Sequence, residues 1–154
     1  MPEGVVQRHG RLEGGRKRVG IVSARFNIGL TSALVSSAVE ALLAAGVRPG
    51  DIEVVWVPGS FELPLALKRL AKHGAFDALI ACGVVIEGAT RHAELIMNGL
   101  TQSFVKLSLD LDCPVIDAVV SARSMEQAEA RCLSGSESRG AYAARAALEV
   151  SSTF

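Results

Sequence analysis

The chain has 154 residues, 49% hydrophobic and 21% charged, which favours one domain with its own core. Its formal net charge of zero argues against the strongly basic surface of a protein that binds nucleic acid or anionic membranes. The three cysteines are widely spaced, which argues against a disulfide framework and against a metal site. No apolar run is long enough to span a bilayer, and residues 1–15 lack the apolar segment of a signal peptide, so we expect a cytoplasmic protein.

The first part of the chain predicts an arm followed by two strand–helix pairs. Residues 1–17 are rich in glycine and charge and have no periodicity, which indicates an arm before a single domain at 18–154. The patterns that follow predict a buried strand over 18–23, a helix over 31–45, a strand over 52–57 and a helix over 60–73. Gly46 is expected to close the first helix, and Ser60 to cap the second.

The second part of the chain repeats this alternation. A continuous apolar run predicts a strand buried on both faces over 78–82, and the residues at 96, 100, 103, 104 and 107 fall on one helical stripe. The remaining patterns predict a strand over 115–120, a helix over 124–132, a loop over 133–139 and a helix over 140–151. Strand and helix alternate throughout, which predicts a parallel sheet covered by helices on both faces.

Sheets of this kind bind ligands beyond the carboxyl ends of their strands, so four separate loops are expected at one edge. These loops comprise residues 25–27, 59–62, 88–92 and 121–123. In the third loop, a glycine-bracketed hinge over 83–92 delivers Thr90, Arg91 and His92 to a helix start, whose free N–H groups and positive dipole suit an anion. The alternative is that Thr90 only caps the helix and His92 is an ordinary first-turn residue.

Each remaining candidate also has a purely structural explanation. Phe26 either packs under its own turn or stacks on a flat ligand. Glu62 is favoured at a helix start in any case, and Ser60 is most simply a cap. Arg131 is expected near a helix C-terminus, and Arg139, in a loop of glycine and serine, is expected in solvent. Because no dinucleotide, P-loop or nucleophile-elbow motif is present, the residues alone predict a small anionic ligand and one titratable imidazole.

Four motifs in combination are more specific than any one of them. They are Arg-Phe-Asn at 25–27, Pro-Gly-Ser-Phe-Glu at 58–62, Gly-Val-Val-Ile-x-Gly-Ala-Thr-x-His at 83–92 and Met-Glu-Gln-Ala-Glu-Ala-Arg at 125–131. In this order and spacing they resemble the 6,7-dimethyl-8-ribityllumazine synthase family, in register from Arg18 to Val150. The resemblance implies an α/β three-layer sandwich with a four-stranded parallel sheet in the flavodoxin-like order 2-1-3-4.

The resemblance also implies a transferase, working without a cofactor, at the penultimate step of riboflavin biosynthesis. It would condense 5-amino-6-ribitylamino-uracil with 3,4-dihydroxy-2-butanone 4-phosphate to 6,7-dimethyl-8-ribityllumazine, with release of phosphate and water. The catalytic residues would be His92, which shuttles protons, and Arg131, which faces the phosphate opposite Thr90. The implied substrate-binding residues are Phe26, Asn27, Gly59, Ser60, Phe61, Glu62, Val84, Val85, Ile86, Ala89, Thr90, Asp117 and Arg139.

Subunit contacts are expected from the residues, since the chain is apolar for its size. The family forms pentamers, some of which assemble a hollow sixty-subunit shell, and its sites lie between subunits. Asp117 and Arg131 would then come from a different chain than Phe26 and His92. The arm, at residues 5–12, would add a strand to a neighbour's sheet. No nucleic acid or membrane is expected as a partner.

This chain departs from the family pattern at several positions. Asp117 stands where an aromatic or large apolar residue is usual, Arg139 replaces a common lysine, and Val84 replaces a common threonine. A carboxylate at position 117 removes a packing wall and repels a nearby phosphate. A second hypothesis is therefore a weakly active or non-catalytic paralogue that binds flavin-like or lumazine-like ligands. A shell-forming structural protein would have no need of the set Phe26, Thr90, His92 and Arg131.

Overall fold

The computed structural model describes residues 1–88 and 92–154. Along the chain, the strands and α-helices are β1 (Val19–Ala24), α1 (Ile28–Ala44), β2 (Ile52–Val57), α2 (Leu63–His73), β3 (Ala78–Ile86), α3 (His92–Leu111), β4 (Val115–Ala122), α4 (Met125–Cys132) and α5 (Arg139–Ser151). Short 3-10 turns precede β2, α2 and α5, at Pro49–Asp51, Ser60–Glu62 and Gly135–Glu137. The predicted alternation of strand and helix is confirmed.

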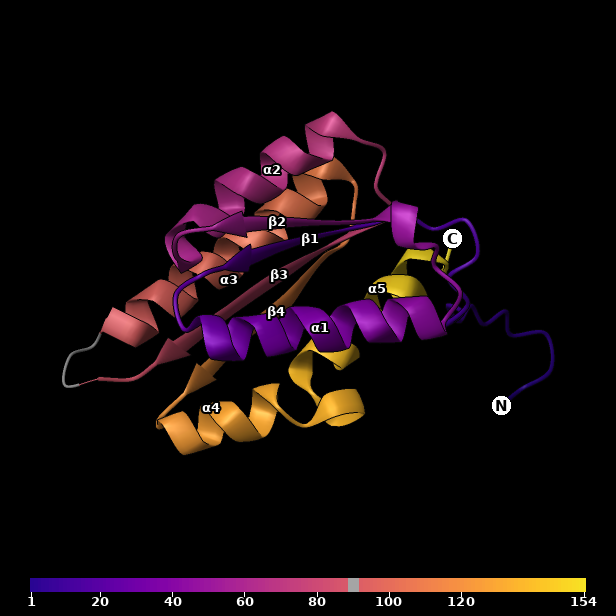
Figure 1. Cartoon of the computed structure of the whole chain (residues 1–154). Coiled ribbons are helices and arrows are strands. Elements are labelled where there is room, and N and C mark those ends of the chain that lie inside the picture. Colours follow the sequence, from indigo (N-terminus) through magenta and orange to yellow (C-terminus); the bar gives the residue numbers. More distant parts are fainter. Residues whose placement is uncertain (89–91) are drawn as a thin grey trace.

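The sheet has the order β2-β1-β3-β4, and all three strand pairs are parallel. Helices α1, α4 and α5 cover one face and α2 and α3 cover the other, which gives three layers (Figure 1). This is the flavodoxin-like α/β sandwich that the sequence analysis expected. Because every strand runs in the same direction, all four carboxyl ends lie at one edge of the sheet.

The two inner strands form the centre of the core. Every residue of β1 is buried, and β3 is buried from Ala78 to Val85. One apolar cluster fills the space between the sheet and α1, α4 and α5, and a second lies between the sheet and α2 and α3. Strands buried on both faces have no polar side to present, which explains their continuous apolar sequences.

β3 is longer than predicted, because it continues to Ile86 instead of ending at Cys82. Its last residues pair with β4, from Gly83 opposite Val119 to Ile86 opposite Ala122. Gly83 is therefore a strand residue and not part of a hinge. A Cβ at Gly83 would lie 3.0 Å from the Ser60 Oγ, so this glycine allows the loop after β2 to approach the strand closely.

Two helix starts also differ from the prediction. α1 begins at Ile28, because Asn27 adopts a left-handed conformation (φ 60°) and its carbonyl accepts hydrogen bonds from the amides of Leu30 and Thr31 at 2.9 and 3.0 Å. Ser60 does not cap α2: it begins a 3-10 turn, and α2 follows only at Leu63. At α4 the predicted cap is confirmed, since the Ser124 Oγ accepts from the Gln127 amide at 3.1 Å.

The second half of the arm is attached to the domain. The Arg11 amide donates to the Ser152 Oγ at 2.6 Å, and the Gly14 amide donates to the Ala45 carbonyl at 2.6 Å. The Lys17 Nζ donates to the Ser151 carbonyl at 2.9 Å. Residues 1–9 are exposed. Among the residues that the structure describes, the helices fall short of the length and apolar character needed to cross a membrane.

Candidate active site

Backbone and side-chain hydrogen bonds join the loop after β1 to the carboxyl ends of β2 and β3. The amides of Arg25 and Phe26, after β1, donate to the carbonyls of Val57 and Pro58, after β2, at 2.7 and 3.1 Å. The Asn27 Nδ2 donates to the Val84 carbonyl in β3 at 3.3 Å. The loops therefore meet at the carboxyl edge of the sheet, which we call the rim. Asn27, expected to bind substrate, also has this structural role.

Two aromatic side chains of the rim extend into solvent. Phe26 and Phe61 are each 71% exposed, so the Phe26 ring does not pack beneath its own turn. A phenyl ring in this setting loses its contact with water when a flat molecule stacks on it, which favours binding of planar ligands. The explanation that Phe26 packs under its own turn is therefore excluded, and stacking on a ligand stays a prediction.

The polar groups after β2 are partly occupied with one another. The Glu62 Oε2 accepts a hydrogen bond from the Gly59 amide at 2.9 Å, and the Glu62 amide donates to the Gly59 carbonyl at 3.2 Å. Glu62 is exposed, and one of its carboxylate oxygens accepts this hydrogen bond. Ser60 lies beside Gly83 of β3 and is half-buried. A hydroxyl and a carboxylate in these positions suit a polyhydroxylated ligand.

The residues after β3 complete the rim as far as the structure describes it. Val84 and Val85 are buried and Ile86 is half-buried, so a ligand at the end of β3 would meet little of the valine side chains. The Glu87 amide continues the ladder by donating to the Ala122 carbonyl at 2.8 Å. His92 is the first residue of α3, and its side chain is exposed. Ala89 and Thr90, assigned to the site from the sequence, lie outside the described residues.

The two predicted arginines lie together, on the open side of β4. The Arg131 Nη1 donates to the Ser121 carbonyl, and the Arg139 Nη2 donates to the Asp117 carbonyl at 3.0 Å. The expectation that Arg139 lies in a loop is therefore wrong, because it is the first residue of α5 and binds the backbone of β4. Its side chain is exposed to solvent, as expected. Both arginines line a cavity of about 490 Å³, here called the β4-edge cavity, together with Val119, Val120, Ser121, Glu137, Ser138 and Tyr142.

Side chains occupy much of the outer backbone of β4. The carbonyls of Pro114 and Ala122 accept hydrogen bonds from the amides of Leu79 and Glu87, on the β3 side. The backbone N–H and C=O groups of residues 115, 117, 119 and 121 therefore point away from β3, toward the open edge of the sheet. The Val115 amide donates to the Ser108 Oγ at 2.9 Å, and the Val119 amide donates to the Asp117 Oδ1 at 2.9 Å. Arg131 and Arg139 bind the carbonyls of Ser121 and Asp117. Each of the four residues whose backbone faces the open edge thus has one backbone group already bonded to a side chain. β4 is therefore poorly suited to accept another strand.

Asp117 is placed differently from the rim residues. Asp117 pairs with Ala81 of β3 and lies five residues before Ala122, the last residue of β4. At about 3.3 Å per residue, this places Asp117 roughly 16 Å from the rim. It also lines a cavity of about 210 Å³ beside α3. Burial raises the pKa of the Asp117 carboxyl, although the Val119 amide and the Arg139 charge oppose this shift. Asp117 thus meets the β4-edge residues, not Phe26 or Ser60 of its own protomer.

We expect Asp117→Asn to stabilise the protein at neutral pH. The raised pKa means that ionised Asp117 costs folding free energy, and this cost develops as the pH rises from the ordinary carboxyl value of 3.8 through the folded-state pKa. Asparagine keeps the oxygen that accepts from the Val119 amide. Urea denaturation of both proteins should show a higher midpoint for the variant at pH 7, and the difference should shrink as the pH falls toward 4. A constant difference across this range would contradict the assignment.

The cysteines do not provide a nucleophile. Burial raises the pKa of the Cys82 thiol to about 12 and that of Cys132 to about 11, and it also raises the pKa of Cys113. The thiolate is the reactive form of cysteine, so these three thiols are inert at neutral pH.

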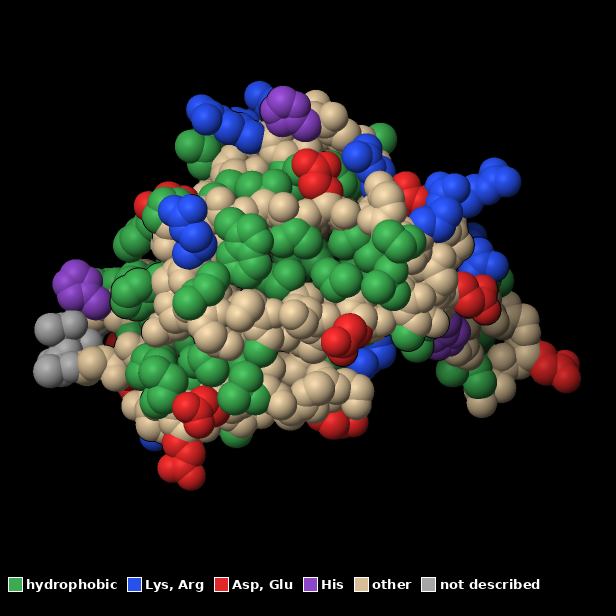
Figure 2. Space-filling view, viewed as in Figure 1, with side chains coloured by type: hydrophobic (Ala, Val, Ile, Leu, Met, Phe, Trp, Pro, Cys, Tyr) green, Lys and Arg blue, Asp and Glu red, His purple; other side chains and the backbone are tan. Residues whose placement is uncertain are grey.

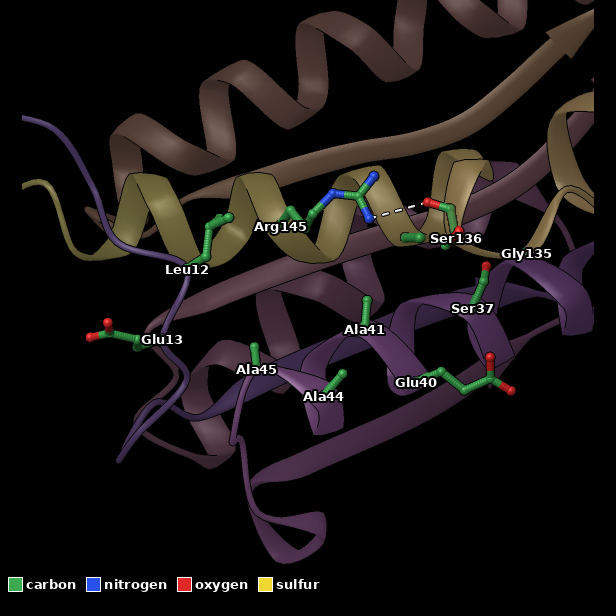
Figure 3. A pocket seen from close by; sticks show the side chains of 11 residues that line it. Leu12, Glu13, Ser37, Glu40, Ala41, Ala44, Ala45, Gly135, Ser136 and Arg145 are labelled. Atoms are coloured by element: carbon green, nitrogen blue, oxygen red, sulfur yellow. Dashed lines mark hydrogen bonds between the residues drawn. The ribbon is translucent and has the colours of Figure 1, made fainter.

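A larger cavity, of about 640 Å³, lies between α1, α5 and the arm (Figure 3). Alanines 41, 44, 45 and 141 form much of its lining, and the Arg145 Nη1 donates to the Ser136 carbonyl at its border at 3.2 Å. None of its lining residues belongs to the four loops at the rim or to the residues predicted for the site. Its size alone does not make it the functional site.

Tyr142 lines the β4-edge cavity but was not among the residues predicted for the site. Its ring lies against the Arg139 guanidinium, with 4.9 Å between the Cζ and the ring centroid. The signal was present in the sequence, because residues three apart lie on the same face of a helix. It was overlooked because the helix was predicted to begin after Arg139.

The fold and the rim define an α/β protein of the flavodoxin-like kind, with ligand-suited loops at the carboxyl edge of a parallel sheet. Comparison with protein families adds the specific assignment. The family model described as 6,7-dimethyl-8-ribityllumazine synthase matches residues 16–154. The chain belongs to this family, whose members are transferases of riboflavin biosynthesis.

Proposed function

We propose that this protein condenses 5-amino-6-ribitylamino-uracil with 3,4-dihydroxy-2-butanone 4-phosphate to 6,7-dimethyl-8-ribityllumazine, with release of phosphate and water. The observation that carries the proposal is the joined rim, in which Phe26 is hydrogen-bonded to Pro58 and Asn27 to Val84, in a chain that matches the family over residues 16–154. The reaction needs two partners to be held together, and a rim built from several loops can position both.

In the proposed complex, the exposed Phe26 ring stacks on the pyrimidine. Ser60 and Glu62 bind the ribityl chain, because a hydroxyl and a carboxylate oxygen suit a polyol. The neighbouring Gly59 and Phe61 shape this part of the site. The backbone at Val84, Val85 and Ile86 reads the edge of the pyrimidine, since the side chains there point mainly into the core.

The second substrate would bind through its phosphate. Thr90, Ala89 and the amides before α3 would take the phosphate from one side, and Arg131 and Arg139 from the other. His92, at the start of α3, would transfer protons during imine formation and phosphate elimination. No step of this reaction calls for a cofactor.

The proposed active form is a homo-oligomer with sites between adjacent subunits, so that Arg131 and Asp117 of one subunit face Phe26 and His92 of the next. We further propose that residues 1–17 act as an arm to the domain at 18–154. Of residues 5–12, the exposed stretch 5–9 would pair with β2 of a neighbour, because the Arg11 amide and carbonyl are already bonded to Ser152. Figure 2 shows a band of apolar side chains along β2, between α2 and α1, and Trp56 in β2 is 37% exposed. Among residues 1–88 and 92–154, no strand lies on the outer side of β2, whereas the outer side of β4 is already occupied by side chains.

The experiment is direct. Purified protein is mixed with both substrates, and the growth of lumazine absorbance is compared with the spontaneous reaction. A rate well above the spontaneous one supports the enzyme. A rate equal to it, combined with tight binding of riboflavin or of the lumazine, would instead support a binding protein. The second candidate is favoured by one observation: Asp117 lies beside Arg139 and places a carboxylate near the proposed phosphate site.

Arg131→Ala is expected to raise the KM for the butanone phosphate about 10- to 100-fold, the value of one or two charge-assisted hydrogen bonds to phosphate. The KM for the pyrimidine should change little, because Arg131 lies on the far side of the site from the stacking ring. Steady-state kinetics with each substrate varied in turn measure both constants. Arg145→Ala is a matched control, since Arg145 also donates to a backbone carbonyl but lines a different cavity. Similar losses for both substrates would refute the role of Arg131.

A further inference from the structure

The start of α5 is anchored by its contacts with α1. Buried Ser138 caps the helix, and its hydroxyl contacts the Ser37 Oγ in α1 at 2.6 Å. A Cβ added to Gly140 would lie 2.1 Å from the Leu34 carbonyl oxygen, so the two helices approach as closely as glycine allows. The backbone at Arg139 is therefore fixed, and only its long side chain remains to be oriented.

The positive charge of Arg139 interacts unfavourably with the dipole of its own helix. It is the first residue of α5, at the positive end of the helix dipole, where a cation is disfavoured. Two contacts offset this. The guanidinium donates to the Asp117 carbonyl at 3.0 Å, and it lies over the Tyr142 ring at 4.9 Å from the centroid. The backbone of Tyr142 is part of α5, and its side chain is 54% exposed and lines the β4-edge cavity.

The consequence is a cavity with two oriented guanidinium groups. Arg131 reaches it from α4 and is bound to the Ser121 carbonyl, and Arg139 reaches it from α5. Each carbonyl contact uses one N–H of a group that has five, so donors remain for a ligand. Two cations held in one cavity of about 490 Å³ suit a phosphate group. Glu137 in the lining and Asp117 beside Arg139 each bring a carboxylate that offsets part of this positive charge.

We propose that Tyr142 is a positioning residue: its ring holds the Arg139 guanidinium against β4, so that Arg139 and Arg131 together bind the phosphate group of the substrate. A lysine could neither stack its charge as a flat plane nor donate two parallel hydrogen bonds. The guanidinium at position 139 therefore depends on the aromatic ring at position 142 for its orientation. This inference rests on the proposed function and adds a residue to it.

The first test measures phosphate binding without turnover. Isothermal titration of the full-length protein with inorganic phosphate gives Kd for the wild type, Tyr142→Leu and Tyr142→Phe. Leucine keeps apolar bulk but removes the π-face, and we expect it to weaken binding about two- to fivefold, the contribution of one exposed cation–π contact. Phenylalanine keeps the ring and should retain wild-type binding. Phe154→Leu is a matched control, because Phe154 is a fully exposed aromatic outside this cavity.

A double-mutant cycle separates positioning from general structural damage. If Tyr142 acts through Arg139, then Tyr142→Leu has no further effect on Kd in an Arg139→Ala background. An equal loss in that background, an unchanged Kd for Tyr142→Leu alone, a Tyr142→Phe variant that behaves like the leucine one, or a wild type that binds no phosphate would each overturn the inference.

Kinetics then separate this inference from the proposed reaction. Tyr142→Leu should raise the KM for the butanone phosphate and leave the KM for the pyrimidine unchanged. If the titrations show the expected cycle but no lumazine forms, the reaction is refuted and the two-arginine site stands. If lumazine forms but the cycle shows no coupling, the reaction stands and the role of Tyr142 is refuted.

Discussion

His92→Ala is expected to lower kcat about 10²- to 10⁴-fold, the usual contribution of a positioned acid–base group. His92 is the first residue of α3 and its side chain is exposed, so the imidazole is open to a ligand. The KM for the pyrimidine should stay nearly constant, because binding of that ring is assigned to Phe26 and the backbone of β3. Initial rates of lumazine formation at saturating concentrations of both substrates measure the effect.

The control for this experiment is a second histidine of similar exposure. His73 is the last residue of α2, where a cation is favoured by the helix dipole, and it belongs to no predicted loop of the site. His73→Ala should leave kcat within about twofold of wild type, since surface substitutions have small effects. Equal rates for wild type and His92→Ala would remove His92 from the mechanism.

Gly140→Ala is expected to destabilise the fold by about 3 kcal/mol, the upper range for overpacking a close contact. The new methyl carbon would lie 2.1 Å from the Leu34 carbonyl oxygen and 2.7 Å from the Ser37 Oγ. Relief requires α5 to move away from α1, which also breaks the buried contact between Ser138 and Ser37. For a domain of this length the melting temperature should fall by about 6–12 °C, measured at fixed protein concentration.

Gly29→Ala distinguishes this steric effect from the general effect of changing a glycine. A Cβ at Gly29, near the start of α1, would meet no atom within 4 Å among the described residues. Alanine is the better helix former by about 1 kcal/mol, so this variant should melt at or slightly above the wild-type temperature. If both variants melted alike, the close approach of α1 and α5 would not be the cause.

The fold was predictable because burial leaves a strong mark on sequence. Strands such as β1 and β3 lie between two helical layers, so almost every position is apolar, and the helices between them have clear glycine and serine boundaries. β2 matched its predicted range of 52–57. The order of strands followed from the resemblance to a family, because the alternating pattern gives parallel strands without fixing which of them are neighbours.

The details that failed are those set by contacts between distant segments. Gly83 was interpreted as a hinge, whereas it gives space to Ser60 from another loop. Arg139 was placed in a loop, whereas it begins α5 and contacts the Asp117 carbonyl, 22 positions away, and the Tyr142 ring. No local propensity reports such pairings. The gathering of Phe26, Pro58 and Val84 at one edge was predictable in outline, because parallel strands place their carboxyl ends together.

The asymmetry between the two outer strands limits how this protein can aggregate. A growing fibril needs a template on both sides of each molecule, one to join the stack and one to receive the next member. At β4, the backbone groups that a further strand would need are hydrogen-bonded to side chains, namely those of Ser108, Asp117, Arg131 and Arg139. A neighbour's strand paired with β2, as proposed, would therefore end the series. The two guanidinium groups of the β4-edge cavity would then also protect β4 from pairing with another molecule.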